Sequence, residues 1–338
     1  MPRSLALRLA RRVEHLLERI GARPGAAPVL EAYCGYSTPD GLILRGRVLT
    51  HLRGVQPDPR QSKWVNLRQM LSLFLTDEVA EVTVTGGGTR AVSDAEGYVT
   101  LTVAAGAADF AAGAPWAGVP VRIDDDPGTE IAFPVRLTPA RAEWIVISDV
   151  DDTMIETGAQ SLIRNLWTTF TGSALTRRVH EDAATLMRQL TRGDVNPVFY
   201  VSSSPWNLHR FLEGIFALNC VPRGPMFLRD LGVGDDGIGD SHHDHKGAAI
   251  DAILAANPGL SCWLLGDTGQ HDATVYRDAV LRHPGRVLGV ALREPVPGAS
   301  DDDAEAIAAI EAAGVPCFHG PTFDGAADYL NLQDGDAT

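Results

Sequence analysis

The stretch Trp144-Ile-Val-Ile-Ser-Asp-Val-Asp-Asp-Thr153 runs from an apolar segment directly into three carboxylates. Its apolar residues do not alternate with polar ones, which is typical of a strand buried on both faces of a parallel sheet. Asp149 and Asp151 stand two residues apart, so an extended backbone points both side chains the same way. Carboxylates crowded in this way repel one another, and a hard divalent cation such as Mg²⁺ would take up their charge. The alternative is an acidic loop that caps a helix.

Three more apolar runs without alternation follow along the chain, and helical patterns separate them. Apolar strands that alternate with helices predict an α/β domain built on a parallel sheet. Ligands of such sheets bind beyond the carboxyl ends of the strands, so chemistry is expected directly after each run. The runs are Val198-Phe-Tyr-Val201, Trp263-Leu-Leu265 and 287–292, and helices are expected around 180–190, 206–217, 246–255, 271–281 and 302–313.

Further along the chain, a group of serines and then a lysine are candidates for binding phosphate. Ser202-Ser-Ser-Pro205 follows the second run, where Ser202 and nearby amides can hold phosphate oxygens, although helix capping would also account for the serines. Lys246 opens a predicted helix, where a cation opposes the helix dipole. It is one of two lysines among 29 cationic residues, and a compact ammonium suits a bridge between carboxylate and phosphate. A solvated surface lysine is the alternative.

The third run leads into Gly266-Asp-Thr-Gly-Gln-His-Asp272, which brings two more carboxylates to a strand end. Asp267 and Asp272 would complete a coordination sphere of oxygen atoms around Mg²⁺.

The motifs D-x-D-x-T, Ser, Lys and G-D-x4-D, in this order, resemble those of the haloacid-dehalogenase superfamily of phosphohydrolases. Over about residues 30–320 the sequence also resembles the phosphatidate phosphatases named for actin-patch association. This resemblance implies a Rossmann-like catalytic domain, Mg²⁺ as cofactor, and hydrolysis of phosphatidate to diacylglycerol and phosphate. The segments that carry it are 149–157, 201–207, 227–230, 244–246 and 266–272, with 41–48 and 94–98 upstream.

The resemblance also implies a role for each candidate residue. Asp149 is expected to be the nucleophile that forms an aspartyl-phosphate, and Asp151 the group that carries protons. Lys246 is expected to neutralise the phosphate oxygens. The expected substrate-binding residues are Thr153, Ser202 and Ser203. The expected Mg²⁺ ligands are Asp149, Asp151 through its carbonyl, Asp267 and Asp272.

Other functions remain open at this point. The same mechanism could act on a soluble phosphomonoester, which would not need a lipid surface. The carboxylates could hold Mg²⁺ in a non-catalytic module that binds lipid or a partner. A phosphotransferase or mutase would use the same residues.

The length, net charge and cysteines of the chain limit the classes of protein to which it can belong. The 338 residues suffice for two domains, and the net charge of −14 argues against nucleic-acid binding. The four cysteines form no CxxC pair, so a cytoplasmic protein is expected. Residues 1–22 form an arginine-rich amphipathic pattern, which predicts a helix that packs on the protein or lies at a membrane surface. The oligomeric state does not follow from the sequence.

The domain organisation follows from a change of pattern near residue 140. Short alternating strands precede it and predict a β-sandwich-like domain, interrupted by a helix at 63–75. Residues 158–178 are rich in Leu, Ile, Trp and Phe, and are expected to form a flap, a lipid contact or a buried helix. The expected units are an N-terminal helix (1–28), the β-rich domain (29–140), the catalytic domain (141–320) and an acidic tail (321–338).

Overall fold

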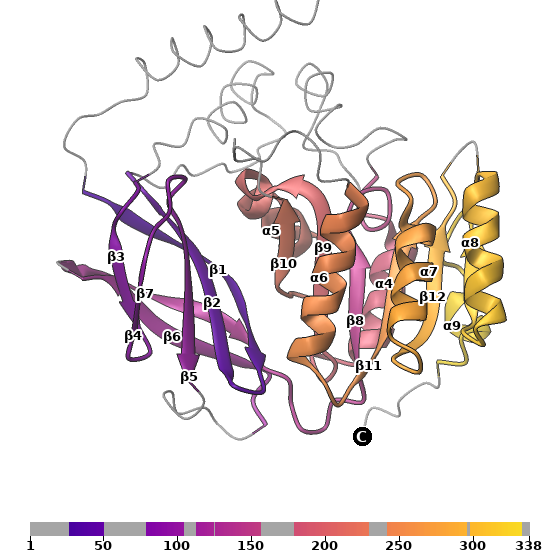
Figure 1. Ribbon diagram of the computed structural model, residues 1–338, viewed down its shortest axis with the longest axis horizontal. Helices are drawn as coiled ribbons and strands as arrows, with labels where there is room; N and C mark the ends of the chain where they lie inside the picture. Colours follow the sequence, from indigo (N-terminus) through magenta and orange to yellow (C-terminus); the bar gives the residue numbers. More distant parts are fainter. Residues whose placement is uncertain are drawn as a thin grey trace, which may run out of the picture.

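The protein contains two β-sheets that stand side by side in the computed structural model (Figure 1). The predicted helices at 1–22 and 63–75, and the segment 158–178, lie outside the described residues. No helix within the described ranges has the length and apolar character needed to cross a membrane. The structure describes residues 27–50, 79–104, 113–124, 126–156, 179–229, 242–295 and 298–332.

The second sheet has six strands, all parallel, in the order β10-β9-β8-β11-β12-β13. Counted from β8, this order is 3-2-1-4-5-6, which is that of a doubly wound sheet with its switch point between β8 and β11. The predicted parallel sheet is therefore confirmed. The strands are β8 (Trp144–Asp149), β9 (Val198–Pro205), β10 (Met226–Arg229), β11 (Ser261–Asp267), β12 (Val287–Arg293) and β13 (Cys317–Gly320).

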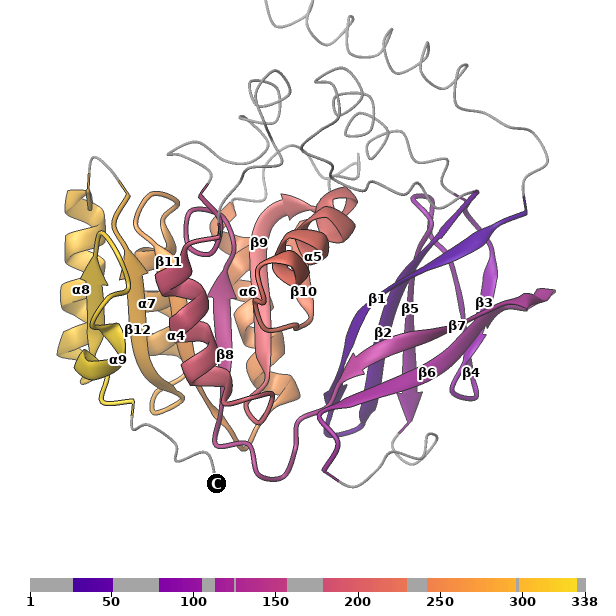
Figure 2. The same cartoon turned by 180° about the vertical axis from the view of Figure 1, so that it is seen from behind.

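Helices cover both faces of this sheet, as the runs without alternation predicted (Figures 1 and 2). Each face has its own apolar core, in which the strands contribute alternate side chains to the two sides. One face carries α6 (His242–Ala256), α7 (Asp272–Arg282) and α8 (Asp301–Ala312). The other carries α4 (Glu181–Thr191), the 3-10 turn η2 (Trp206–Leu208), α5 (His209–Leu218) and α9 (Ala326–Tyr329).

The packed core continues beyond residue 320, where the sequence predicted an acidic tail to begin. Phe323, Ala326 and Leu330 are buried in the same cluster as α4 and α5. The acidic composition hides these apolar positions, because they are spaced at three and four residues between charged ones.

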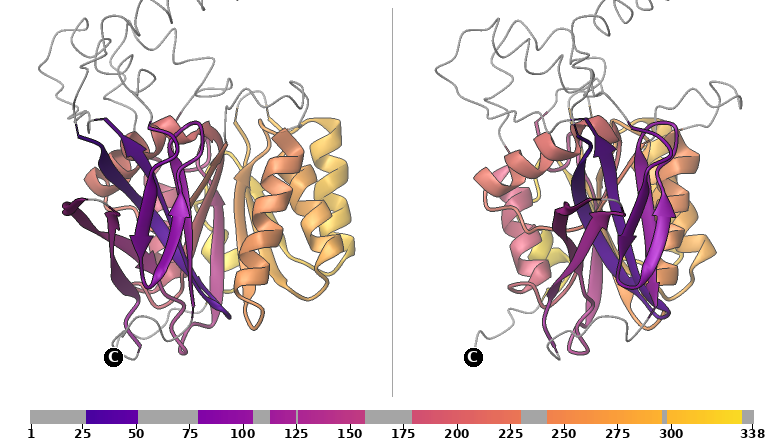
Figure 3. Two further views of the ribbon diagram at one scale, coloured as in Figure 1. Left: turned by 60° about the vertical axis from the view of Figure 1, so that its left-hand side comes forward. Right: turned by 90° about the vertical axis from the view of Figure 1, so that its left-hand side faces the viewer.

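The first sheet has seven strands in the order β4-β3-β6-β7-β1-β2-β5. All neighbours are antiparallel except β1 and β7, and the edge strands β4 and β5 approach each other around one apolar core (Figure 3). The structure thus has one strongly curled sheet instead of the predicted β-sandwich. The prediction was wrong because alternation of apolar and polar residues shows which face of a strand is buried, but not what covers that face. The strands are β1 (Val29–Thr38), β2 (Gly41–Leu49), β3 (Thr83–Gly86), β4 (Thr89–Val92), β5 (Tyr98–Ala104), β6 (Trp116–Ile123) and β7 (Asp126–Arg136).

Aromatic stacking and hydrogen bonds join the two sheets at the junction between β9 and α5. The ring of Tyr33 stacks on Trp206 with centroids 5.0 Å apart. Arg47 donates to the Asn207 side chain at 2.8 Å. The curled sheet therefore contacts the segment that directly follows the three serines.

His209 lies in this junction and makes folding stability dependent on pH. It is 2% exposed and lies 4.3 Å from the Tyr33 ring, centroid to centroid. Burial lowers its pKa from 6.5 to about 4, while Glu213 opposes this shift. The unfolded chain therefore binds a proton between these pH values that the folded protein does not. The contribution of the neutral His209 to the free energy of unfolding is therefore present in full above pH 6.5 and is lost as the pH falls towards 4.

We expect the wild-type protein to lose on the order of 3 kcal/mol more unfolding free energy than His209→Gln between pH 7 and pH 4. Glutamine is neutral throughout this range, so the difference between the two proteins isolates the imidazole. Urea unfolding followed by circular dichroism at several pH values measures it. Parallel pH profiles for the two proteins would contradict a buried neutral His209.

Candidate active site

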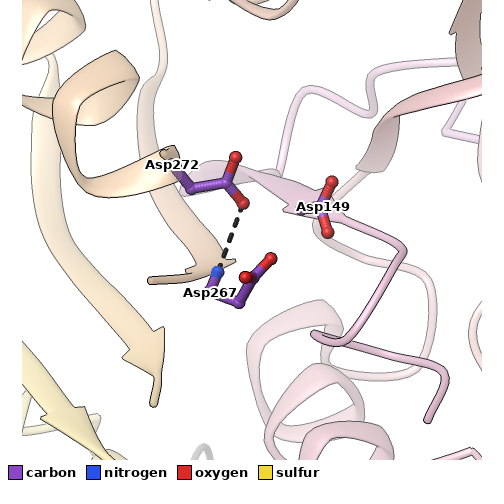
Figure 4. A group of neighbouring side chains, drawn as sticks. All are labelled: Asp149, Asp267 and Asp272. Atoms are coloured by element: carbon purple, nitrogen blue, oxygen red, sulfur yellow. Dashed lines mark hydrogen bonds between the residues drawn. The ribbon is translucent and has the colours of Figure 1, made fainter. Parts of the chain in front are cut away.

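Three buried carboxylates meet at the switch point of the parallel sheet (Figure 4). Asp149 is the last residue of β8 and Asp267 the last of β11, so the neighbouring strands deliver them to one edge. Asp272 begins α7. An oxygen from each carboxylate lies within 4.8 Å of the others. The sequence-based expectation that these strand ends converge is met.

Asp272 is held against the end of β11 by the backbone. Its Oδ2 accepts a hydrogen bond from the Asp267 amide at 3.2 Å (Figure 4). Gly266 makes this approach possible, because a Cβ atom there would stand 2.7 Å from Asp272 Oδ2 and 2.7 Å from the ring of Tyr276. The Tyr276 hydroxyl in turn donates to the Leu265 carbonyl at 2.6 Å, which fixes α7 on the strand.

Lys246 reaches the same cluster from the second turn of α6. Its Nζ donates to Asp149 Oδ1 at 2.7 Å and also to Asp272 Oδ1. The side chain is only 3% exposed, so the alternative of a solvated surface lysine is excluded. The sequence suggested that this lysine bridges a carboxylate and a phosphate, and the structure places it against two carboxylates.

Burial and the charges of neighbouring side chains together determine the pKa values of the groups in this cluster. Burial is the largest cause that raises the pKa of Asp149, while Lys246 lowers it and Asp272 raises it further. Burial and then Asp272 likewise raise the pKa of Asp267. Burial would lower the pKa of Lys246, but the carboxylates, led by Asp149, raise it above its ordinary value. The raised pKa of Lys246 favours its ammonium form, whereas the raised pKa values of Asp149 and Asp267 favour protonation of these carboxylates.

Asp151 faces the serines at the end of β9. Its Oδ2 accepts hydrogen bonds from Ser202 Oγ at 2.9 Å and Ser204 Oγ at 3.0 Å. Burial raises the pKa of Asp151, and the two hydroxyl hydrogen bonds oppose that shift. Ser203, predicted to bind substrate, makes no side-chain hydrogen bond within the described part of the chain. Ser204, by contrast, was expected only to cap a helix, yet it is a partner of Asp151.

The turn after Asp149 places the backbone around the site. Asp152 adopts a left-handed conformation with φ 58°, which aspartate tolerates better than most residues. The Asp152 amide donates to the Ile155 carbonyl at 2.9 Å, which closes the turn. Thr153 is fully buried, and its Oγ1 has no hydrogen-bond partner among the residues that the structure describes. Gln270 donates to the Asp151 carbonyl at 3.3 Å, so the oxygen predicted to ligate a metal already has one partner.

The oxygen atoms that lack partners indicate where a cation fits. Asp149 Oδ2 and Asp267 Oδ2 are buried and accept no hydrogen bond from any described residue. Both residues belong to the group of carboxylates within 4.8 Å. Buried carboxylates without partners are costly unless a positive charge compensates them. The arrangement therefore fits a metal ion held by oxygen ligands. The Asp151 carboxylate lies outside this group.

Replacing Ser202 or Ser204 by alanine is expected to lower kcat about tenfold to a hundredfold, because each change removes one of the two hydrogen bonds that orient the buried Asp151 carboxyl group. Mg²⁺ affinity should stay unchanged, since neither serine contacts the three-carboxylate group. Steady-state kinetics at varied Mg²⁺ measures both quantities. Ser261→Ala, at the first position of β11 and so at the opposite end of that strand from Asp267, is the matched control and should keep kcat near the wild-type value. Equal kcat losses in all three variants would contradict a specific role for the Asp151 contacts.

A lysine-bridged set of carboxylates at the switch point of a parallel sheet defines a candidate metal-binding site for phosphoryl transfer. Residues 144–294 match the sequence model of the family described as phosphatidate phosphatase APP1, catalytic domain. The resemblance predicted from the motifs is thus confirmed for this segment.

Two curated relatives each match a part of the chain. The first is phosphatidate phosphatase APP1 of Saccharomyces cerevisiae, 32% identical over 161 residues. The second is an uncharacterized protein of Schizosaccharomyces pombe, 27% identical over 151 residues. Each alignment covers 44% of this chain and 25% of the relative, so the chain spans about a quarter of the matched curated relatives.

Solved structures give only a distant likeness. The Pnkp1/Rnl/Hen1 RNA repair complex contains a chain with 12% identity and a TM-score of 0.28, covering 54% of this chain and 43% of that one. A second structure of the Pnkp1/Rnl/Hen1 complex gives 13% identity and a TM-score of 0.28, covering 57% and 54%. Similarity at this level carries no argument about fold or function.

Proposed function

We propose that the protein is a Mg²⁺-dependent phosphatase of the haloacid-dehalogenase type that forms an aspartyl-phosphate on Asp149, and that phosphatidate is its substrate. The contact that carries the proposal is the 2.7 Å hydrogen bond between Lys246 and Asp149, which leaves Asp149 Oδ2 without a partner. This contact holds the Asp149 carboxylate beside the ammonium group, in a position from which it can attack phosphorus.

The reaction divides between two carboxylates. A carboxylate oxygen of Asp149 attacks phosphorus, and the bond from phosphorus to the leaving alkoxide breaks. Asp151 donates a proton to that alkoxide and then removes one from the water that hydrolyses the aspartyl-phosphate. The two serines hold Asp151 through one of its oxygens, which leaves Oδ1 without a partner and available for proton transfer. Lys246 stabilises the negative charge on the phosphoryl oxygens.

The cation would be held by Asp149, Asp267 and Asp272, with the Asp151 carbonyl as a further candidate. Hard carboxylate oxygens suit Mg²⁺ rather than a soft transition metal. When bound, Mg²⁺ would supply positive charge that offsets the surplus of buried carboxylates and favours phosphate binding. Thr153 and Ser203 remain proposed substrate contacts.

The lipid substrate is proposed from the name of the matched family and of the Saccharomyces cerevisiae relative. A membrane contact through residues 1–22 and a cytoplasmic location are proposed alongside it. A soluble phosphomonoester is the competing substrate, since the residues that act on phosphorus are the same.

Phosphate release from phosphatidate in mixed micelles tests this function, with Mg²⁺ or EDTA, beside a panel of soluble phosphomonoesters. The proposal expects Mg²⁺-dependent release that is much faster from phosphatidate than from the soluble compounds. Release from soluble esters alone would remove the lipid from the proposal and keep the mechanism. Absence of release from every substrate would overturn the phosphatase assignment.

A further inference from the structure

A pocket of about 290 Å³ lies between the two sheets, and none of the candidate active-site carboxylates lines it. The curled sheet contributes β2 and β5, and the catalytic domain contributes Trp206, β10 and the start of α6. β2 faces the β10 edge of the parallel sheet in Figure 1. The walls are largely aromatic, with the rings of Tyr33, Tyr98, Trp206 and Phe227. A pocket with such walls suits a small molecule with an apolar body.

Arg45 is the cation of this pocket, and it has no carboxylate partner among the described residues. Its guanidinium stacks 4.5 Å from the centre of the Phe227 ring. Within the described part of the chain it makes one hydrogen bond, to the Tyr36 hydroxyl at 3.3 Å. A guanidinium has five N–H donors, so most of them remain available to a ligand. Burial lowers the pKa of Arg45, as expected for a cation removed from water without a counter-ion.

The neighbouring charged residues are already engaged. Arg47, two residues along β2, donates to Asn207 and to the Glu96 carbonyl. Asp94, which also lines the pocket, accepts from the amides of Glu96 and Tyr98 and so closes its own turn. Arg45 therefore differs from the arginine beside it in having donors to spare.

We propose that this pocket binds a small organic oxyanion, in which a phosphate or carboxylate group is carried on an apolar body. Arg45 would bind the oxyanion through the edge of its guanidinium, whose paired donors match two oxygens of either group. The aromatic walls would pack on the apolar body. Such a ligand would contact both sheets at once. The proposal stands apart from the phosphatase reaction, because the pocket shares no carboxylate with that site.

Calorimetric titration of the full chain in EDTA tests the proposal, with phenyl phosphate and benzoate as probes. EDTA removes the Mg²⁺ that the proposed reaction requires, so binding of the probes is measured without turnover. We expect binding of at least one probe by the wild type, weakened about tenfold or more in Arg45→Gln. Arg122→Gln, an exposed arginine on β6, is the matched control and should bind as the wild type does.

A second variant tests the site without removing the arginine. Thr100 on β5 is exposed, pairs directly across from Arg45, and lines the pocket. Thr100→Glu would place a carboxylate opposite Arg45 and supply the partner it lacks. This variant should abolish binding, while Thr102→Glu, two residues along the same strand and outside the pocket, should not.

The two probes identify the ligand class: tighter binding of phenyl phosphate assigns a phosphate, and tighter binding of benzoate a carboxylate. The proposal is overturned if the wild type binds neither probe. It is also overturned if Arg45→Gln and Thr100→Glu, shown to be folded by circular dichroism, bind as the wild type does. Binding of inorganic phosphate as tightly as phenyl phosphate would refute the role of the aromatic walls.

Discussion

Asp149→Asn is expected to lower phosphate release at least about a thousandfold, because an amide cannot take the place of the attacking carboxylate. Asparagine has nearly the same shape as aspartate, so the buried end of β8 should remain packed. The variant removes one negative charge from a cluster in which carboxylates outnumber the ammonium. Initial rates at saturating Mg²⁺ measure the loss separately from any weaker metal binding.

Two controls make this result specific. Asp302→Asn, the same change at an exposed position on α8, should leave the rate unchanged. Asp149→Ala guards against slow deamidation of the asparagine, which would regenerate the aspartate. Activity in Asp149→Ala close to that of the wild type would contradict the nucleophile assignment.

Lys246→Arg is expected to lower kcat by about a hundredfold to a thousandfold, although the charge is kept. Lys246 Nζ is enclosed between Asp149 and Asp272, and the side chain is 3% exposed. A guanidinium is larger, planar and rigid, so it cannot occupy this space as a point charge does. The loss should appear chiefly in kcat, because the contact stabilises charge that develops on the phosphoryl group.

The same substitution at the other lysine of the chain, Lys63, cannot serve as the control, because Lys63 lies outside the described residues. A suitable control is the reverse exchange, Arg282→Lys, at the last residue of α7. Arg282 forms a half-exposed ion pair with Asp251 of α6, and its replacement should leave kcat unchanged. A kcat in Lys246→Arg within about threefold of the wild type would contradict the bridging role, because the loss of even one charge-assisted hydrogen bond exceeds that effect.

The parallel sheet was predictable because its strands are buried on both faces. Trp144 to Ile147 has no polar position, and helical spacing separates it from the next apolar run. The curled sheet was less predictable. Alternation in Tyr98 to Val103 identifies the buried face, but a facing sheet and the far side of the same curled sheet bury it equally well.

The candidate site followed from topology more than from any single residue. Asp149, Asp267 and Asp272 are far apart in sequence, and the switch point between β8 and β11 brings them together. The role of Ser204 was missed, although a signal existed. Ser202 and Ser204 are two apart on an extended strand, so both point to Asp151 while Ser203 points away.

The pocket around Arg45 was not predictable, because it forms between two separate sheets. The sequences of β2 and β10 contain no pattern that predicts a pocket. The aromatic residues that line it come from segments far apart in the sequence. Only the docking of the curled sheet against the β9–α5 junction brings them together.

Trapping of the covalent intermediate is the measurement that tests the central claim most directly. The enzyme is quenched in acid during turnover, reduced with borohydride, digested, and analysed by mass spectrometry. Borohydride converts an aspartyl-phosphate into homoserine, so the account predicts homoserine at position 149, dependent on substrate and absent from Asp149→Asn. Homoserine at another aspartate, or none in an enzyme that is turning over, would contradict Asp149 as the nucleophile.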